Sequence, residues 1–295
     1  MNNISRILVA TDFSAAGHAA VRRSGQLAAQ YGAALHVIHA TPDWTLFCNR
    51  SAMLQKHYED ITSNAQTLLK DELGSLLDEF SVHASGEIQQ GKASQTIARA
   101  VGSFRPNLLV IGTRGEHAPI TAPASLGGTT MKLLSQIKLP LLLVREATVT
   151  PYSTCVAAIG NSTEQSRRIV HWAVSLVDGG DCHLVRSYEV PYLERLKLSG
   201  VNAEAIAGCT QDAELAARYA ADPPWSEEDA NARIHMHLVR GTPIPAVLAE
   251  VTRHSPQLVA VGRHEATRLE ADHPLMGCVG IRLAYHCPVD VLVVP

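Results

Sequence analysis

The sequence lacks the two features that would tie it to a membrane or to nucleic acid. Although 46 % of its 295 residues are hydrophobic, no apolar run reaches the roughly 18 residues that a membrane-spanning helix needs. Its formal net charge is −3 at pH 7, and without a long basic block it has no electrostatic footprint for nucleic acid. We therefore expect a globular protein that binds neither a membrane nor nucleic acid.

Cysteine is also scarce. The six cysteines form no C-x-x-C pair and are too sparse for a disulfide framework. Residues 1–6 lack the basic region and the apolar stretch that open a secretory signal. These observations predict reduced thiols and a cytoplasmic protein.

Sequence signatures of catalysis are missing as well. No G-x-S-x-G motif occurs. Residues 86–93 resemble a P-loop, but Ala93 stands where the Mg²⁺-binding hydroxyl residue belongs. We therefore assign no catalytic residue and expect no dedicated enzyme.

A metal site has only a partial signal. His235 and His237 would place two imidazoles on one strand face, which is half of a metal site if His264 or Glu265 lies nearby. No fixed ligand spacing accompanies the pair, so the sequence predicts no resident metal.

The sequence does contain an internal repeat. The segment Leu108–Gly112 matches Leu258–Gly262, 150 residues later. Three aligned pairs have the same spacing: Gly112 with Gly262, Gly115 with Glu265, and Gly127 with Gly277. The chain is therefore interpreted as a tandem duplication, with domains predicted at residues 1–147 and 152–295. We call residues 1–150 the first repeat and residues 151–295 the second repeat.

Each repeat alternates short apolar runs with helical patterns, which is typical of βαβ units. The strands are expected at 7–10, 35–40, 82–89, 108–112 and 141–144, and at 155–159, 182–187, 233–239, 258–261 and 289–294. Because parallel strands need long crossovers, we expect two five-stranded, mainly parallel α/β sheets of the Rossmann-like class. Residues 202–221 are expected to add a helix to the second repeat.

In such sheets, ligands bind beyond the carboxyl ends of the strands, where the strand order reverses. Thr11 and Asp12 follow the first strand, and residues 112–115 follow the fourth. The chain then leads to residues 127–129 at an expected helix start, where glycine N–H groups and the helix dipole suit a polyphosphate. The alternative is that the glycines only shape a tight turn and Thr129 only caps the helix.

These segments resemble the universal stress protein family over nearly the whole chain, as two fused copies. The resemblance rests on residues 7–14 (ILVATDFS), 35–38 (LHVI), 112–115 (GTRG) leading to 126–129 (LGGT), and 287–294 (CPVDVLVV). It implies an adenine nucleotide alpha hydrolase-like fold and a role in stress survival. In one branch of the family it also implies ATP binding, with Mg²⁺ present only with the bound nucleotide.

The resemblance also implies a binding site in the first repeat for ATP or another adenine nucleotide as a regulatory ligand. Asp12 and Val37 would contact the adenosine, and the glycine-rich segments would hold the phosphates. The implied binding set is Thr11, Asp12, Val37, Gly112, Arg114, Gly115, Gly127, Gly128 and Thr129.

The first repeat departs from the family pattern in its loop. The pattern has nine residues between its second and third glycines, whereas eleven residues, 116–126, separate Gly115 from Gly127. Gly128 also occupies the place of a small hydroxyl residue, although Thr129 follows it and could substitute.

The second repeat departs further. Asn161 stands near the place of the aspartate, and Glu265 stands where the second glycine belongs. Because a carboxylate repels a phosphate, we expect this repeat to bind ATP poorly.

The apolar final strands of the repeats, 141–144 and 291–294, would be exposed sheet edges. In the family this strand commonly forms the dimer contact, so we expect these strands to pair with each other or in a homodimer. The alternative function is a scaffold that binds no nucleotide, whose two domains form a pseudo-dimer and bind protein partners or another small ligand.

Overall fold

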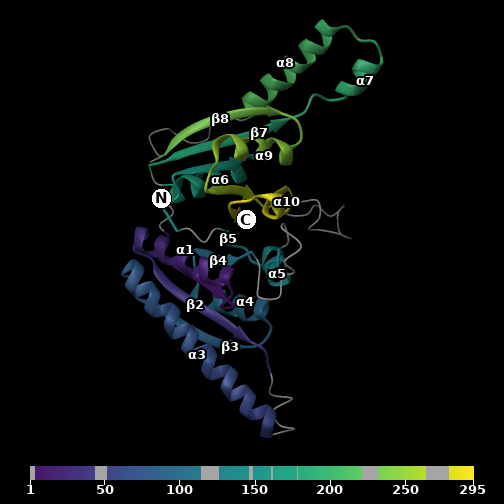
Figure 1. Ribbon diagram of the computed structural model, residues 1–295. Helices are drawn as coiled ribbons and strands as arrows, with labels where there is room; N and C mark the ends of the chain where they lie inside the picture. The colour runs from purple at the N-terminus through teal and green to yellow at the C-terminus, as the bar shows by residue number, and fades with distance from the viewer. Residues whose placement is uncertain are drawn as a thin grey trace. The chain divides into compact units, whose positions relative to one another are not determined.

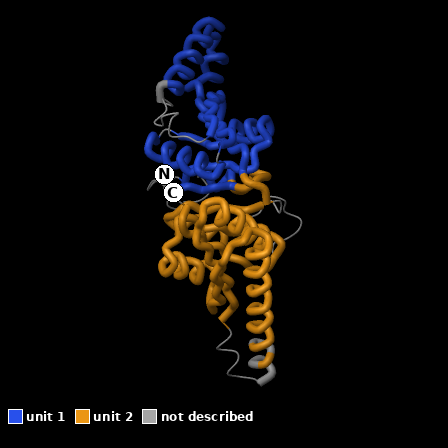
Figure 2. The backbone as a smooth tube through the Cα atoms, turned by 90° about the vertical axis from the view of Figure 1, so that its left-hand side faces the viewer, with its two compact units in different colours: residues 1–2, 152–283, 291–295 blue, residues 3–151, 284–290 orange. Residues whose placement is uncertain are grey.

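The computed structural model describes residues 4–43, 52–113, 126–145, 149–160, 162–177, 179–220, 232–263 and 279–295. The chain forms two compact units, coloured in Figure 2. One comprises residues 3–151 and 284–290, and the other comprises residues 1–2, 152–283 and 291–295.

Within the described residues, the first repeat contains five strands. They are β1 (Arg6–Thr11), β2 (Ala34–Thr41), β3 (Ala84–Gln90), β4 (Leu108–Gly112) and β5 (Leu141–Val144). Their order is β3-β2-β1-β4-β5, and neighbouring strands pair in parallel. The strand order therefore reverses between β1 and β4, at the carboxyl ends of these two strands.

The second repeat has the same topology in the part of the chain that the structure describes. Its strands are β6 (Thr154–Ala158), β7 (Asp181–Tyr188), β8 (Arg233–Arg240), β9 (Leu258–Gly262) and β10 (Asp290–Val294). Their order is β8-β7-β6-β9-β10, and β6 pairs in parallel with both β7 and β9. The predicted α/β class with mainly parallel sheets is confirmed.

Helices connect the strands (Figure 1). They are α1 (Ala15–Tyr31), α3 (Ala52–Phe80), α4 (Ala93–Phe104), α5 (Gly128–Gln136), α6 (Thr163–Leu176), α7 (Leu193–Leu198), α8 (Ala203–Ala220), α9 (Pro243–His254) and α10 (Val279–His286). In the first repeat α1 packs on β1 and β4 and α4 packs on β2, while in the second repeat α9 packs on β7. A search of the described helices found none long and apolar enough to cross a membrane.

Local sequence sets where several helices begin and end. The Ser14 hydroxyl accepts a hydrogen bond from the Gly17 N–H at 3.2 Å and caps α1, and Ser162 caps α6 in the same way. Such caps satisfy an N–H group that the helix itself leaves without a partner. Gly32 ends α1 with a left-handed φ of 63°, a conformation that glycine adopts without a steric penalty.

The structure differs from the sequence prediction at two boundaries. The expected strand at residues 82–89 begins later, at Ala84, after Ser81 leaves helix α3 with a left-handed φ of 57°. The expected helix at 202–221 is present as α8, but the short helix α7 precedes it. Tyr192 begins α7 with a φ of 58°, which the intrinsic preference of tyrosine does not predict.

Candidate functional site

In the first repeat, the end of β4 lies beside the start of α5. The Gly127 N–H donates to the Thr113 carbonyl oxygen at 3.0 Å, and the Thr130 hydroxyl donates to the Gly112 carbonyl oxygen at 3.4 Å. A Cβ atom at Gly112 would lie 2.7 Å from the carbonyl oxygen of Ala16 in α1. Gly112 is therefore needed for the close packing of α1 on β4, whether or not it also contacts a ligand.

Helix α5 begins at a residue that has no side chain to cap it. Its N-cap residue is Gly127, so Thr129 does not cap the helix. Gly128 and Thr129 are exposed and lie in the first turn, whose N–H groups have no intrahelical partner and carry the positive end of the helix dipole. This helix start can accept an anion.

Thr11 and Asp12 follow β1 in different surroundings. Thr11 is 5 % exposed, and its hydroxyl donates to Glu72 Oε1 at 3.1 Å. Asp12 is exposed, and its carboxylate accepts a hydrogen bond from the Ser14 N–H at 3.1 Å. The Thr11 side chain is therefore part of the interior, while Asp12 can reach a ligand.

The Glu72 carboxyl group is buried beneath this corner. It is 5 % exposed, and besides Thr11 it contacts His18, with 2.8 Å between His18 Nδ1 and Glu72 Oε1. Burial raises the pKa of Glu72, and the neighbouring His18 partly opposes that rise. The ionised form of Glu72 is thus disfavoured in the folded protein.

Val37 is fully buried within β2, four residues before the strand ends. Its side chain packs in the core, and its contact with adenosine stays a prediction. His39 lies on the same face and closer to the carboxyl end, with its ring 4.3 Å from the Phe13 ring and its Nδ1 2.9 Å from the Thr11 carbonyl oxygen. Sequence reasoning missed this aromatic pair, although both residues flank strand ends that it had singled out.

The structure brings two residues of the predicted binding set, Asp12 and Gly112, to the same turn of α1. A Cβ atom at Gly17 would lie 2.8 Å from Asp12 Oδ1, just as one at Gly112 would contact Ala16. Other predicted residues lie outside the described residues, and their roles stay predictions: Arg114 and Gly115 in the first repeat, and Asn161, Glu265 and Gly277 in the second.

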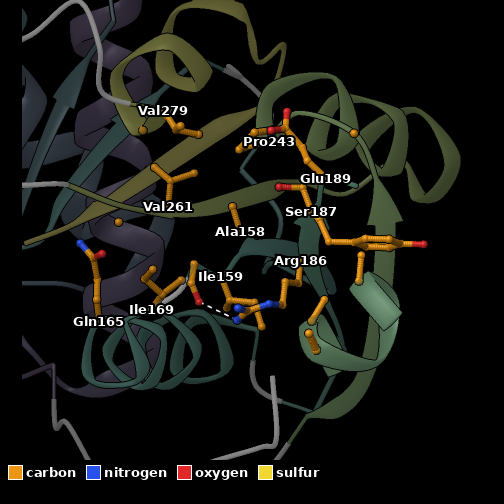
Figure 3. Close-up of a pocket in the computed structure, with 18 residues that line it drawn as sticks. Ala158, Ile159, Gln165, Ile169, Arg186, Ser187, Glu189, Pro243, Val261 and Val279 are labelled. Atoms are coloured by element: carbon orange, nitrogen blue, oxygen red, sulfur yellow. Dashed lines mark hydrogen bonds between the residues drawn. The ribbon is translucent and has the colours of Figure 1, made fainter. Parts of the chain in front are cut away.

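A cavity of about 590 Å³ lies in the second repeat, at the carboxyl ends of β6, β7 and β9 (Figure 3). Its walls come from the ends of these strands, from one face of α8 and from the start of α10. Figure 3 shows Val279 and Pro243 on one side of the cavity and Ile169 and Arg186 on the other. The volume is within the range of about 300–1,000 Å³ that is typical of small-ligand sites. Sequence reasoning missed this site because it looked only for the glycine pattern.

The cavity combines apolar walls with a few placed polar groups. Arg186 is 5 % exposed, and its Nη1 donates to the Gly160 carbonyl oxygen at 2.8 Å. Burial lowers the pKa of the Arg186 guanidinium, which nevertheless remains a cation in proteins. Gln165 Nε2 donates to the Arg263 carbonyl oxygen at 2.9 Å, which holds the carboxamide beside Gly262.

The charges along the cavity wall are balanced. Arg186 supplies one positive charge and Glu189 one negative charge to the lining. A triphosphate carries several negative charges and would meet no net positive charge in these described residues. The cavity therefore suits an apolar ligand with a small charge better than it suits ATP.

Both repeats thus define the same class of protein: an α/β domain whose candidate site lies where the strand order of a parallel sheet reverses. The family model described as the universal stress protein family matches residues 3–145 and, again, residues 151–295. The chain therefore belongs to the universal stress protein family, with two tandem copies.

Solved structures support the fold. A universal stress protein from Archaeoglobus fulgidus DSM 4304 shares 16 % identity with a TM-score of 0.69, covering 100 % of this chain and 99 % of that one. A putative universal stress protein from Pseudomonas aeruginosa UCBPP-PA14 shares 15 % identity with a TM-score of 0.61, covering 99 % and 93 %. A functionally unknown protein from Pseudomonas aeruginosa PAO1 shares 15 % identity with a TM-score of 0.61, covering 99 % and 92 %. A search of curated proteins gave no significant match.

Proposed function

We propose that this universal stress protein binds ATP or another adenine nucleotide in its first repeat as a regulatory ligand. The observation that carries the proposal is the start of α5, where the N-cap residue is a glycine and the hydrogen bond from Gly127 to Thr113 fixes the helix beside the end of β4. A helix start of this kind supplies backbone N–H donors and a positive dipole to a phosphate. Mg²⁺ would accompany the nucleotide.

The adenosine end of the nucleotide would lie beside Asp12. Its exposed carboxylate is an acceptor for ribose hydroxyl groups, and it adjoins the same turn of α1 as Gly112 does. The neighbouring rings of Phe13 and His39 offer flat apolar surface for a base. We propose no catalytic residue, because phosphate binding alone identifies no reaction, and we expect slow hydrolysis at most.

Gly128 offers a sharp test of this proposal. A Cβ atom there meets no atom of the described residues within 4 Å, so Gly128→Glu and the control Gly128→Ala should both fold. The glutamate would place a negative charge in the phosphate site. At about 4 Å this costs roughly 1–4 kcal/mol per charge pair, which is at least about a fivefold loss of affinity.

The measurement is calorimetric titration of the full chain with ATP and Mg²⁺. We expect heat from the wild type and from Gly128→Ala, and little heat from Gly128→Glu. Equal affinity in Gly128→Glu and Gly128→Ala would contradict a phosphate site at the start of α5. No heat from the wild type would favour the scaffold function instead.

The cavity of the second repeat favours a second candidate function. We propose that it binds a nucleoside-sized ligand with no more than about one negative charge, because apolar walls enclose a buried cation at Arg186. Adenosine, which is neutral, and a cyclic adenosine monophosphate, which carries one negative charge, are suitable probes. Binding that is weakened by Arg186→Met and retained in the exposed control Arg240→Met would support this site.

The two candidate sites can be distinguished from each other. ATP binding that survives Gly128→Glu and is lost in Arg186→Met would move the nucleotide to the second repeat. If neither repeat binds any of these probes, the scaffold remains as the function. Pairing of the final strands, within the chain or in a homodimer, stays a prediction, which sedimentation of the full chain at several concentrations tests.

A further inference from the structure

Four histidines gather on one corner of the second repeat, away from the cavity. In the parallel register of β7 and β8, His183 pairs with His235 and Val185 pairs with His237, so the three imidazoles share one face of the sheet. The α9 helix packs on β7, and its last residue, His254, adds a fourth ring. The ring centroids of His183 and His254 are 3.6 Å apart.

Three of these rings place nitrogen atoms close to one another. His183 Nδ1 lies 3.0 Å from His237 Nε2, and one nitrogen from each of His183, His237 and His254 lies within 4.8 Å of the others. In a tetrahedral zinc site with Zn–N bonds of about 2.0–2.1 Å, the ligand nitrogens are about 3.3 Å apart. The nitrogen atoms are thus near these separations, and one of the stacked His183 and His254 rings would turn about its side-chain bonds to coordinate the same ion.

A buried carboxylate lies behind two of the three rings. Glu250 is 1 % exposed, and its Oε2 is hydrogen-bonded to His254 Nε2 at 3.1 Å and lies 3.7 Å from His237 Nδ1. A metal-bound histidine usually donates its other N–H to a carboxylate, as His254 can donate to Glu250, and this bond fixes the tautomer and the ring orientation. The nitrogens on the far side of these rings, His254 Nδ1 and His237 Nε2, are then the ones that would bind an ion. Arg253 donates to the other Glu250 oxygen at 2.8 Å.

The charge state of the cluster also suits a cation. Burial, followed by the effect of His254, lowers the pKa of His183 to about 4, and burial lowers the pKa of His237. Both rings are therefore neutral near pH 7, the state in which imidazole binds metals. His235 differs from the other three, because its Nε2 is held by Asp181 Oδ1 at 2.9 Å.

The first repeat shows that the fold does not require this cluster. His36 pairs with Ser85 there, just as His183 pairs with His235. The positions that align with His237 and His254 are Glu87 and Phe104, and the Phe104 ring stacks on His36 at 5.1 Å. The same corner thus holds one histidine in the first repeat and three clustered histidines in the second.

We propose that His183, His237 and His254 form a site for a divalent transition-metal ion of the zinc type, with Glu250 as the carboxylate that orients His254. Imidazole ligands favour Zn²⁺, Cu²⁺ and Ni²⁺ over Mg²⁺ and Ca²⁺. His237 and His254 side chains are 23 % and 21 % exposed, so an ion can enter from solvent. A water molecule would complete the coordination as the fourth ligand.

The first repeat supplies a substitution that this corner of the fold already accommodates. His254→Phe copies the stacked Phe104 and removes a ligand while keeping an aromatic ring in place. His183→Gln removes a second ligand. His235→Gln is the matched control, because it changes a histidine of the same cluster that is bound to Asp181 and lies outside the proposed ligand set.

The experiment uses the full chain without an affinity tag, stripped of metal by a chelator. Titration with Zn²⁺ should give one ion per chain for the wild type and for His235→Gln, and a loss of at least about 10-fold in affinity for His254→Phe and His183→Gln. Co²⁺ should give the strong visible absorption of a tetrahedral complex, and this absorption should disappear in His254→Phe. Zn²⁺ should also raise the unfolding midpoint of the wild type.

Two results would overturn the proposal. One is a wild type that binds no stoichiometric Zn²⁺ or Co²⁺, which would leave a hydrogen-bonded histidine cluster only. The other is metal binding that is equal in the wild type and in a folded His183→Gln, His254→Phe double variant, which would place the ion at other histidines. Circular dichroism of each metal-free variant establishes that it is folded.

Discussion

Alanine substitution at three glycines tests which of them the fold itself requires. A Cβ atom at Gly112 would lie 2.7 Å from the carbonyl oxygen of Ala16, a backbone atom that cannot move alone. At Gly262 the nearest atoms, also at 2.7 Å, belong to the flexible Gln165 side chain. At Gly128 nothing in the described part of the chain lies within 4 Å. The same chemical change should therefore have three different effects.

The magnitudes follow from these contacts. Gly112→Ala forces α1 away from β4, and such overpacking typically lowers the free energy of unfolding by about 1–3 kcal/mol. Gly128→Ala adds a good helix former to the first turn of α5 and should raise it by up to about 1 kcal/mol. Gly262→Ala should fall between them, because Gln165 can change rotamer. The first two variants should thus differ by about 1–4 kcal/mol.

Urea unfolding followed by circular dichroism measures these differences, and thermal unfolding repeats the comparison at roughly 2–4 °C per kcal/mol. If Gly112→Ala is as stable as Gly128→Ala, Gly112 is not needed for the packing of α1 on β4. A glycine at this position would then be explained by contact with a ligand. If Gly262→Ala is the least stable of the three, the argument from side-chain flexibility fails.

Three further predictions concern buried and exposed polar groups. Because the folded state raises the pKa of Glu72 above 4.5, the contribution of the protonated Glu72 side chain to stability is full below about pH 4.5 and is lost as the pH rises through the folded-state value. Glu72→Gln should therefore become increasingly stabilising, relative to the wild type, from pH 4 to pH 8. Urea midpoints across that range check this, and a constant difference would contradict it. Ser14→Ala and Ser162→Ala each remove a helix cap and should cost about 0.5–2 kcal/mol; no change in the urea midpoint would mean that water replaces the cap. Arg22 and Glu79 form an exposed ion pair, so Glu79→Gln should change the free energy of unfolding by less than about 1 kcal/mol. A larger loss in the same assay would contradict the view that this surface ion pair adds little stability.

Much of the fold could be predicted from hydrophobic pattern. The runs at Leu108–Gly112 and Leu141–Val144 are buried strands as expected, because apolar β-branched and leucine runs are typical of a sheet covered on both faces. Element boundaries were less certain. Ser81 and Tyr192 adopt left-handed backbone conformations that propensity does not favour for non-glycine residues, and these conformations set where β3 and α7 begin.

The candidate sites were harder to predict, because they depend on contacts between distant segments. Sequence reasoning noted His235 and His237, but the partners proposed here, His183 and His254, come from β7 and α9 and were not singled out. Only the spacing of Glu250 and His254, four residues apart on one helix face, was a local signal for them. The role of Gly112 was ambiguous for the same reason, since its neighbour Ala16 is distant in sequence.

The histidine corner of the second repeat has an equivalent corner in the first repeat, which can serve as an internal control for metal binding. β2, β3 and the end of α4 form the same three-part arrangement as β7, β8 and the end of α9, with Phe104 where the second has His254. Amide hydrogen exchange can therefore follow both corners in a single sample, under identical pH, salt and temperature. If an added ion slows amide exchange at only one corner, the difference comes from the side chains, because both corners have the same backbone arrangement.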